Sequence, residues 1–127
     1  MLQLMNDVPA HVVGIRALGN VTKEDYETTF VPAIERAAKN GEINFIMVFE
    51  TDLSNITYGA WMQDAKMSIK HFGKWNKVAI VSDQKYVEKL AYIFNYLSPA
   101  EAKGFPVSDI EIAKAWVAAP AASAATS

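Results

Sequence analysis

The chain has 127 residues, of which 51% are hydrophobic and 20% are charged, and its formal net charge is −2 at pH 7. This length and composition are typical of one compact domain that folds without covalent staples. The sequence contains no cysteine, which excludes disulfides and thiolate catalysis and fits a reducing compartment. The near balance of charge offers no clustered cationic excess, so we expect no nucleic acid partner.

The two ends of the chain predict location and domain limits. Residues 1–7 lack the basic and apolar regions of a secretory leader, and no later run is long and uncharged enough to span a bilayer. We therefore expect a cytoplasmic protein, with peripheral membrane contact as a further expectation. The stretch 119–127 is rich in Ala and Ser and contains Pro120, which predicts a single domain over residues 1–118 and a flexible tail.

The apolar residues change period repeatedly along the chain, which is typical of an α/β protein. In chain order they predict strand, strand, helix, strand, helix, strand, helix, strand and helix, over residues 2–4, 11–19, 22–40, 43–49, 59–72, 77–82, 84–97, 102–106 and 108–117. The nearly continuous apolar stretch Ile43–Phe49 indicates the centre of the sheet, a strand covered on both faces. The order favours a mixed sheet of about five strands, with right-handed crossovers and four covering helices.

Local signals place several helix ends. Thr22 has the chemistry of an N-cap with acidic residues in the turn after it, and Asn40-Gly41 is a C-terminal stop. Pro32 lies inside the same helix, where it removes one hydrogen bond, so we expect a kink or a broken first turn there. Further side-chain caps are predicted at Asp83, Ser108 and Asp109.

The connection from the central strand to the second helix is the most informative stretch for function. It reads Asp52-Leu53-Ser54-Asn55-Ile56-Thr57-Tyr58-Gly59-Ala60-Trp61, the layout of a switch loop in a small α/β module. Asp52, Ser54 and Thr57 are its candidate switch residues. A serine or threonine in such a loop is more often an ordinary turn or cap residue.

These residues carry a family resemblance. The order of elements, with Asp52–Thr57 after the central strand, resembles the STAS fold of the anti-sigma-factor antagonists. The residues Trp61-x-x-Asp64-x-Lys66, His71, Lys77-Val78-Ala79-Ile80-Val81-x-Asp83, Phe105 and Ala115-Trp116 are more similar to the SpoIIAA-like branch of that superfamily. The resemblance covers about Val12 to Val117 and implies an α/β binding or regulatory module. The architecture also resembles the lipid-binding CRAL-TRIO modules.

One departure from the antagonists bears on regulation. In the phosphorylated antagonists an Asp-Ser-Ser-Gly segment opens the helix after the central strand, so that a phosphate sits among free backbone N–H groups. Here the matching stretch is Tyr58-Gly59-Ala60-Trp61, with no hydroxyl at the serine position. We therefore expect no phosphoserine switch at that position.

The sequence shows no recognisable catalytic machinery. Its two histidines, His11 and His71, have no metal-ligand spacing to another histidine. Asp64 and His71 lie seven residues apart on one predicted helix and form no evident acid–base pair. No glycine-rich phosphate cradle, nucleophile elbow or dinucleotide fingerprint occurs. We expect a protein that is not an enzyme and has neither a cofactor nor a metal site.

Apolar residues exceed what covering the sheet requires. In the second helix, one apolar stripe is predicted to pack on the sheet, except for Trp61 and Met62 near the sheet rim, while Met67 projects from the opposite side. The stripe comprises Tyr58, Trp61, Met62, Ala65, Ile69 and Phe72. The third helix has a wider apolar arc, which includes Tyr86, Leu90 and Ile93. The surplus leaves three alternatives: a groove for an apolar molecule, a homodimer interface on the third helix, or a membrane-facing edge.

A basic and aromatic segment lies at the end of the second helix. It consists of Lys66, Lys70, Lys74 and Lys77, with Trp75 among them. Such a segment either favours anionic lipid headgroups or is a solvated helix terminus whose lysines complement the helix dipole.

Two functional hypotheses remain. The leading one is a non-enzymatic binding or regulatory module for an apolar, lipid-like ligand held between the second and third helices near the carboxyl ends of the central strands. Its predicted apolar wall is Tyr58, Trp61, Met62, Ile93 and Phe94, and its polar rim is Lys66 and His71. The competing hypothesis is a protein-interaction module that docks a partner through Asp52–Tyr58.

Overall fold

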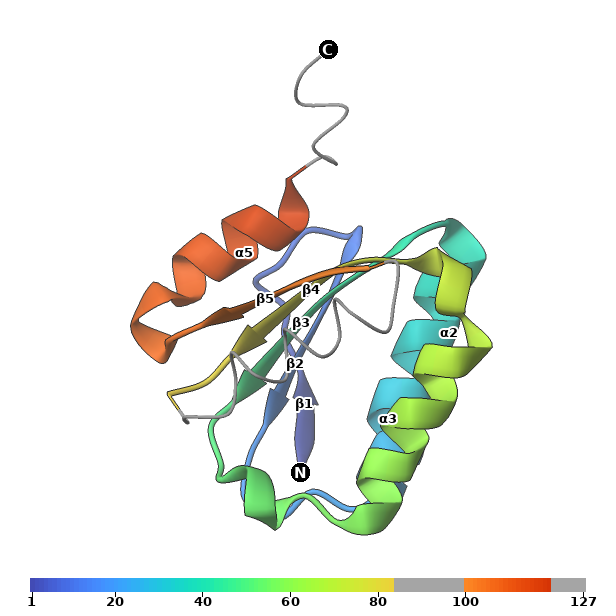
Figure 1. The fold of residues 1–127 in the computed structure, drawn as a ribbon, viewed down its shortest axis with the longest axis vertical. Coiled ribbons are helices and arrows are strands. Elements are labelled where there is room, and N and C mark those ends of the chain that lie inside the picture. The colour runs from blue at the N-terminus through green and yellow to red at the C-terminus, as the bar shows by residue number, and fades with distance from the viewer. Residues whose placement is uncertain (84–99, 120–127) are drawn as a thin grey trace.

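A computed structural model describes residues 1–83 and 100–119, and at positions 53, 61, 64, 65, 68, 69 and 72 it describes the backbone alone. Five strands form one sheet in the order β1-β2-β3-β4-β5 (Figure 1). The strands are β1 (Leu2–Leu4), β2 (Val12–Ala17), β3 (Ile43–Phe49), β4 (Trp75–Val81) and β5 (Glu101–Phe105). β1 is antiparallel to β2, and all other neighbours are parallel. The predicted α/β fold with a mixed five-stranded sheet is confirmed.

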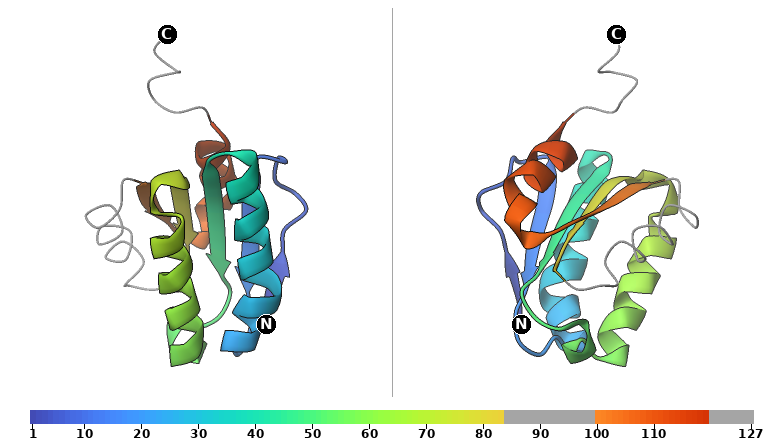
Figure 2. Two further views of the ribbon diagram at one scale, coloured as in Figure 1. Left: turned by 90° about the vertical axis from the view of Figure 1, so that its right-hand side faces the viewer. Right: turned by 60° about the vertical axis from the view of Figure 1, so that its left-hand side comes forward.

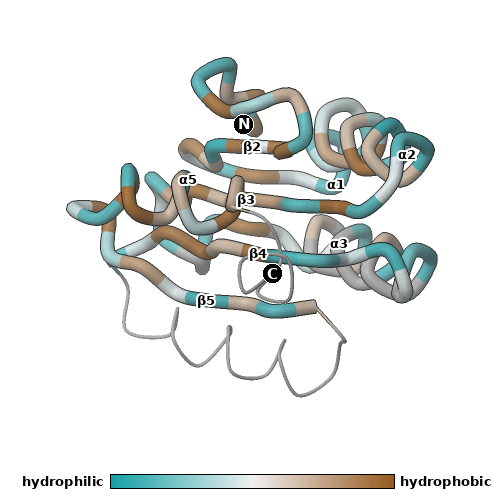
Figure 3. Tube along the Cα trace, turned by 90° about the horizontal axis from the view of Figure 1, so that it is seen from above, coloured by the Kyte–Doolittle hydropathy of each residue, from teal (hydrophilic) through white to brown (hydrophobic). Residues whose placement is uncertain are grey.

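The helices cover both faces of this sheet. Between β2 and β3 the chain runs through α1 (Lys23–Asp25), the π-helical segment η1 (Tyr26–Phe30) and α2 (Val31–Asn40). The remaining elements are η2 (Leu53–Asn55), α3 (Tyr58–Lys70), η3 (Phe72–Lys74), η4 (Val107–Asp109) and α5 (Ile110–Ala118). α2 and α3 lie side by side on one face, and α5 packs on the other (Figures 2 and 3). The helix predicted over 84–97 and the tail beyond residue 119 lie outside the described residues.

The predicted signals at the first helix are present in the structure. Thr22 Oγ1 accepts a hydrogen bond from the backbone N–H of Asp25 at 3.2 Å, and Asp25 Oδ2 accepts from the N–H of Thr22 at 2.9 Å, which forms a capping box. α2 ends at Asn40, and Gly41 follows with φ of 137°, a conformation that favours glycine. The interruption expected at Pro32 appears as the π-helical segment η1 just before it, because Pro32 has no N–H to continue the α-helical ladder.

Two other caps were predicted at aspartates, Asp109 and Asp83. Asp109 occupies the N-cap position of α5, but its side chain makes no capping hydrogen bond. The helix that Asp83 is predicted to cap, over 84–97, lies outside the described residues. The Asp83 carboxylate accepts a hydrogen bond from the backbone N–H of Val107 at 2.9 Å. Asp83 thereby ties the end of β4 to the segment that leads into α5.

The core has two layers separated by the sheet. On the α2 and α3 face, an aromatic series runs from Tyr26 through Phe30 and Phe45 to Trp75, with successive ring centroids 4.8, 5.6 and 6.1 Å apart. On the opposite face, Ala113 and Val117 of α5 pack on apolar residues that include Ile46 and Val81. Every residue of β3 is buried, which confirms its predicted place at the centre of the sheet.

The orientation of α3 differs from the predicted one. Ala60 and Met67, two turns apart, are buried in the core, whereas the Tyr58 side chain is 79% exposed and the Met62 side chain is 42% exposed. The prediction that Tyr58 packs on the sheet and that Met67 projects away from it was wrong. Apolar residues occur all around this helix, so their period does not select one face, and the small Ala60 side chain is what meets the core.

Candidate functional site

The loop after β3 and the first turns of α3 form an ordered edge at the carboxyl end of the parallel strands, here called the β3–α3 rim (residues 52–62). Its first turn is fixed by Asp52, whose Oδ1 atom accepts hydrogen bonds from the N–H of Ser54 at 2.8 Å and from Ser54 Oγ at 2.6 Å. The hydrogen bond from the Ser54 hydroxyl lowers the pKa of Asp52 below its ordinary value. The rim therefore carries an exposed carboxylate that is ionised at neutral pH.

The rim is also tied to the loop between β2 and α1. The N–H of Val21 donates to the carbonyl of Asn55 at 3.0 Å, and the N–H of Thr57 donates to the carbonyl of Val21 at 2.9 Å. These bonds make a parallel bridge between Val21 and Ile56, both of which are buried. The backbone on both sides of Ile56 is thus held by the body of the protein.

The start of α3 is fixed by a cap and by close packing. Thr57 Oγ1 accepts a hydrogen bond from the N–H of Ala60 at 3.2 Å, as an N-cap residue does. A Cβ atom on Gly59 would lie 2.9 Å from Cβ of Lys23, so the absence of a side chain lets α3 approach α1 this closely. Thr57 was predicted as a switch residue, and its hydroxyl is a structural cap here.

The described part of the predicted apolar wall faces outward. Tyr58 and Met62 are four residues apart, so they share one side of α3, and Lys66 follows one turn later, also exposed. The side chain of Trp61 and all of Ile93 and Phe94 lie outside the description. A pocket between α3 and the next helix therefore stays a prediction.

One residue of the predicted polar rim, His71, lies at the opposite end of α3 from Tyr58 of the predicted apolar wall. His71 follows the last residue of α3 and lies about 20 Å along the helix axis from Tyr58, at the amino end of the strands. Its Nε2 atom is 3.4 Å from Glu35 Oε1 of α2, an electrostatic contact rather than a well-formed hydrogen bond. Lys70 Nζ is 2.6 Å from the same oxygen and is the main cause of the lowered pKa of Glu35. The structure does not bring His71 and Tyr58 into one site.

Three members of the basic and aromatic segment, Lys74, Trp75 and Lys77, make contacts within the protein. Lys74 Nζ donates to the carbonyl of Ala38, at the end of α2, at 2.7 Å. Lys77 is only 5% exposed, and its Nζ donates to the carbonyls of Trp116 at 3.1 Å and Ala119 at 3.2 Å. Trp75 is buried in the core. These contacts favour the structural alternative, in which lysines complement helix C-termini, over a surface for lipid headgroups.

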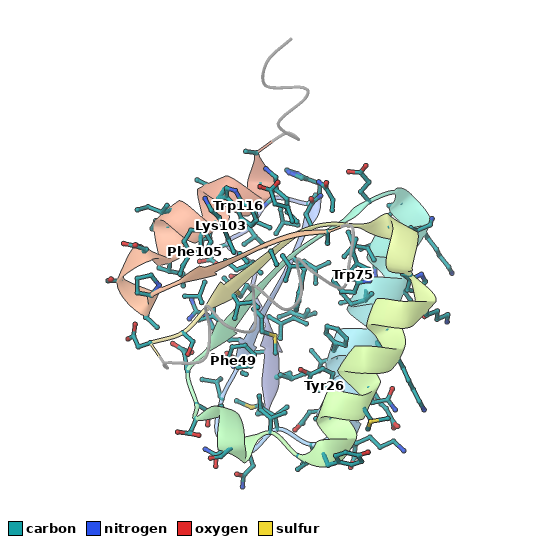
Figure 4. All side chains as sticks on the ribbon, viewed as in Figure 1. Tyr26, Phe49, Trp75, Lys103, Phe105 and Trp116 are labelled. Atoms are coloured by element: carbon teal, nitrogen blue, oxygen red, sulfur yellow. The ribbon has the colours of Figure 1, made fainter. Side chains whose placement is uncertain are left out.

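One cluster was not identified from the sequence. The ammonium groups of Lys77 and Lys103 lie 5.2 and 5.6 Å from the ring centroid of Trp116, and the Trp116 ring packs on Phe105 (Figure 4). His11 Nε2 is 2.8 Å from the carbonyl of Ala118. The cluster holds the C-terminal end of α5 on the sheet. Its members come from distant parts of the chain, so no local pattern in the sequence could have revealed it.

Metal-binding and membrane-spanning features were also considered. Within residues 1–83 and 100–119, no group of three or more His, Asp or Glu side chains is arranged to hold a metal ion. In the same part of the chain, no helix is long and apolar enough to cross a membrane.

The fold and the rim define a small α/β domain with an exposed edge at the carboxyl end of a parallel sheet. The SpoIIAA-like family model matches residues 12–118, and the chain belongs to this family, which confirms the resemblance noted in the sequence. No curated protein matches the chain. It is similar to the crystal structure, at 2.25 Å resolution, of an uncharacterized DUF3478-family protein with a SpoIIAA-like fold from Shewanella loihica PV-4. The identity is 23%, the alignment covers 91% of this chain and 93% of the other, and the TM-score of 0.69 shows a shared fold.

Proposed function

We propose that the protein is a non-enzymatic interaction module that binds a protein partner through the β3–α3 rim. The observation that carries this proposal is the exposure of Tyr58 and Met62 on neighbouring turns of α3. Aromatic residues and methionine are enriched in the cores of protein interfaces. Membership of the SpoIIAA-like family supports a regulatory or interaction module as the general class.

The rigidity of the rim supports the same function. The bridge between Val21 and Ile56 and the cap at Thr57 fix the backbone on which Tyr58 stands. A preformed surface loses less conformational entropy when it binds, so more of its contact energy appears as affinity. Tyr58 is therefore the expected energetic centre of the interface.

The chemistry of the rim also describes its partner. An apolar recess on the partner would complement Tyr58. A cationic group or hydrogen-bond donors would complement the exposed carboxylate of Asp52. Met62 is unbranched and adapts to an irregular apolar surface. We expect a protein partner with a hydrophobic depression bordered by Lys or Arg.

The hypothesis of an apolar, lipid-like ligand remains a second prediction. Its wall depends on Trp61, Ile93 and Phe94, whose side chains are not described. The lysines that were expected to attract anionic headgroups include Lys74 and Lys77, which bind backbone carbonyls instead. The described contacts therefore support the interaction module more directly.

Site-specific photocrosslinking in the native host tests the proposal. A benzophenone amino acid placed at Tyr58 should form adducts with a specific protein, which mass spectrometry can identify. The matched control is the same substitution at Ile112, which is 59% exposed on α5 and far from the rim in sequence. The control position should not capture that protein.

The identified partner then allows a quantitative test. Tyr58→Ala should weaken its binding by at least about ten-fold, which corresponds to about 1.4 kcal/mol. The unfolding midpoint should hardly change, because an exposed side chain contributes little to the fold. Identical adducts from both positions would contradict the proposal. Adducts with lipid alone, or a lipid retained in native mass spectra and lost in Trp61→Ala, would favour the ligand hypothesis instead.

A further inference from the structure

The two sides of the edge strand β1 differ in their hydrogen bonding. β1 pairs with β2 so that Gln3 lies opposite Arg16. On either side of this pair, the carbonyl of Met1 accepts from the N–H of Leu18 at 2.9 Å, and the N–H of Met5 donates to the carbonyl of Gly14 at 2.8 Å. The backbone groups that point toward β2 therefore belong to residues 1, 3 and 5.

The backbone groups between them point the other way. In an antiparallel pair, inward and outward groups alternate along the strand, so the N–H and C=O of Leu2 and Leu4 face the free edge of the sheet. Within residues 1–83 and 100–119 no group pairs with them, and Figure 1 shows β1 as the last strand beyond β2. The edge offers two donors and two acceptors to another strand.

The side chains on this edge are also suited to pairing. The Leu4 side chain is 53% exposed, and the strand Leu2-Gln3-Leu4 carries no charge and no proline. Natural edge strands are usually protected by lysine, proline, a bulge or a covering segment. β1 is short, but it has none of the chemical protections.

We propose that β1 pairs with β1 of a second copy of this chain, antiparallel across a two-fold axis at Gln3. This register places Leu2 of each copy opposite Leu4 of the other. Each Leu2–Leu4 pair exchanges two backbone hydrogen bonds, so all four outward groups of each strand are satisfied. The two sheets then form one continuous sheet.

Symmetry and charge both favour a second copy over an unrelated strand. The outward backbone groups belong to Leu2 and Leu4, on either side of Gln3, so a two-fold axis at Gln3 places each donor of one copy opposite an acceptor of the other. The charges nearest the strand are compensated within each copy, because the N-terminal ammonium group lies 3.5 Å from Asp25 and Asp7 lies 2.5 Å from Lys114. Each of these charges therefore has an opposite charge within its own copy, although the chain as a whole is acidic.

The short strand implies a weak, reversible dimer, because such a contact buries less surface than a stable interface requires. Its position on β1 differs from the dimer interface predicted on the helix over residues 84–97. Sedimentation equilibrium should show a monomer–dimer exchange that depends on protein concentration.

Hydrogen exchange followed by NMR locates the contact. The amides of Leu2 and Leu4 should exchange more slowly as the protein concentration rises, since they become bonded in the dimer. The amide of Gln3 bonds to β2 in both states and is the internal control. Exchange rates of Leu2 and Leu4 that do not change with concentration would overturn the proposal.

Substitutions separate this edge from other surfaces. Leu4→Pro removes an outward N–H without breaking a bond to β2, and proline is tolerated on edge strands. It deletes two hydrogen bonds per dimer and should raise the dissociation constant about thirty-fold. Leu4→Lys is the alternative if the proline variant unfolds, because it introduces a charge on the pairing edge. Ile112→Lys, which changes an equally exposed residue on α5, should leave the dimer unchanged.

The opposite pattern would refute the β1 pairing. A protein that stays monomeric at millimolar concentration, or a dimer that persists in folded Leu4→Pro or Leu4→Lys, would overturn it. A dimer lost in Tyr86→Glu and retained in Leu4→Pro would instead support the interface predicted on the third helix.

Discussion

The two ends of α3 use their side chains in opposite ways. At its start, Tyr58 and Met62 are exposed, and the preceding backbone is held by the bridge between Val21 and Ile56. At its end Lys70 pairs with Glu35, and just beyond it Lys74 binds the carbonyl of Ala38. Tyr58 and Met62 at one end are thus exposed to solvent, whereas Lys70 and Lys74 at the other end contact α2.

This difference shows that residue type alone does not identify a surface. Lysines near an aromatic residue suggested a site for anionic headgroups, yet Lys77 is buried and bonds the last carbonyls of α5. Tyr58 suggested core packing, yet it is the most exposed of the large apolar residues described. A functional surface of this protein is therefore better identified from side chains that stay exposed after folding than from residue type alone.

Of the substitutions that test this comparison, the one at Lys77 should lower the free energy of unfolding most. Lys77→Ala removes a buried ammonium and leaves the carbonyls at the end of α5 without this donor, so the free energy of unfolding should fall by about 2–4 kcal/mol. The matched control is Lys66→Ala, at an exposed lysine on α3, which should change it by less than about 0.5 kcal/mol. Urea denaturation followed by circular dichroism measures both. Equal effects in the two variants would contradict the distinction between engaged and free lysines.

A smaller effect is expected at the other end of α3. In Gly59→Ala the new methyl group would lie 2.9 Å from Cβ of Lys23, so α1 and α3 must separate slightly. The strain should exceed the gain in helix propensity and lower the free energy of unfolding by about 1 kcal/mol. Gly73→Ala, where nothing lies within 4 Å, is the control and should be near neutral. A stabilised Gly59→Ala variant would show that this close approach does not position the rim.

The sequence predicted those parts of the fold that depend on local chemistry. The continuous apolar run Ile43–Phe49 identified β3, and the cap at Thr22 and the stop at Gly41 identified the first helix. These signals act over a few residues and need no knowledge of the rest of the fold. The start of β4 at Trp75 was placed two residues late, because the polar Asn76 separates Trp75 from the apolar run.

The candidate site was less predictable for a physical reason. The loop Asp52–Thr57 was recognised from its position after β3, but the outward direction of Tyr58 depends on how α3 is rotated about its axis. That rotation is set by Ala60 and Met67 in the core and by the contact of Gly59 with Lys23. The partners of His71 and Lys77 lie 36 and 39 or more residues away in sequence, so their roles follow only from the fold.

The smallest expected effect compares one carboxylate from each end as the pH changes. The pKa of Glu35 is lowered mainly by its hydrogen bond with Lys70, and the pKa of Asp52 mainly by the hydroxyl of Ser54. The ordinary pKa is 4.5 for Glu35 and 3.8 for Asp52. Because the folded-state pKa is lowered, each carboxylate stabilises the folded protein at a pH above its ordinary pKa. This stabilisation is lost as the pH falls through the lowered pKa. Glu35 joins α2 to α3, while Asp52 bonds within one loop.

Glu35→Gln should therefore lower the urea midpoint at pH 7, and Asp52→Asn should lower it less. Both differences from the parent should shrink as the pH is lowered from about 5 to about 2, because the parent then loses the same charges. The Glu35 difference should also shrink in 1 M salt at pH 7, since salt screens an exposed ion pair. A Glu35→Gln difference that widened in acid would show that this carboxylate is protonated in the folded protein. It would also show that the ion pair between Glu35 and Lys70 does not stabilise the contact of α2 with α3.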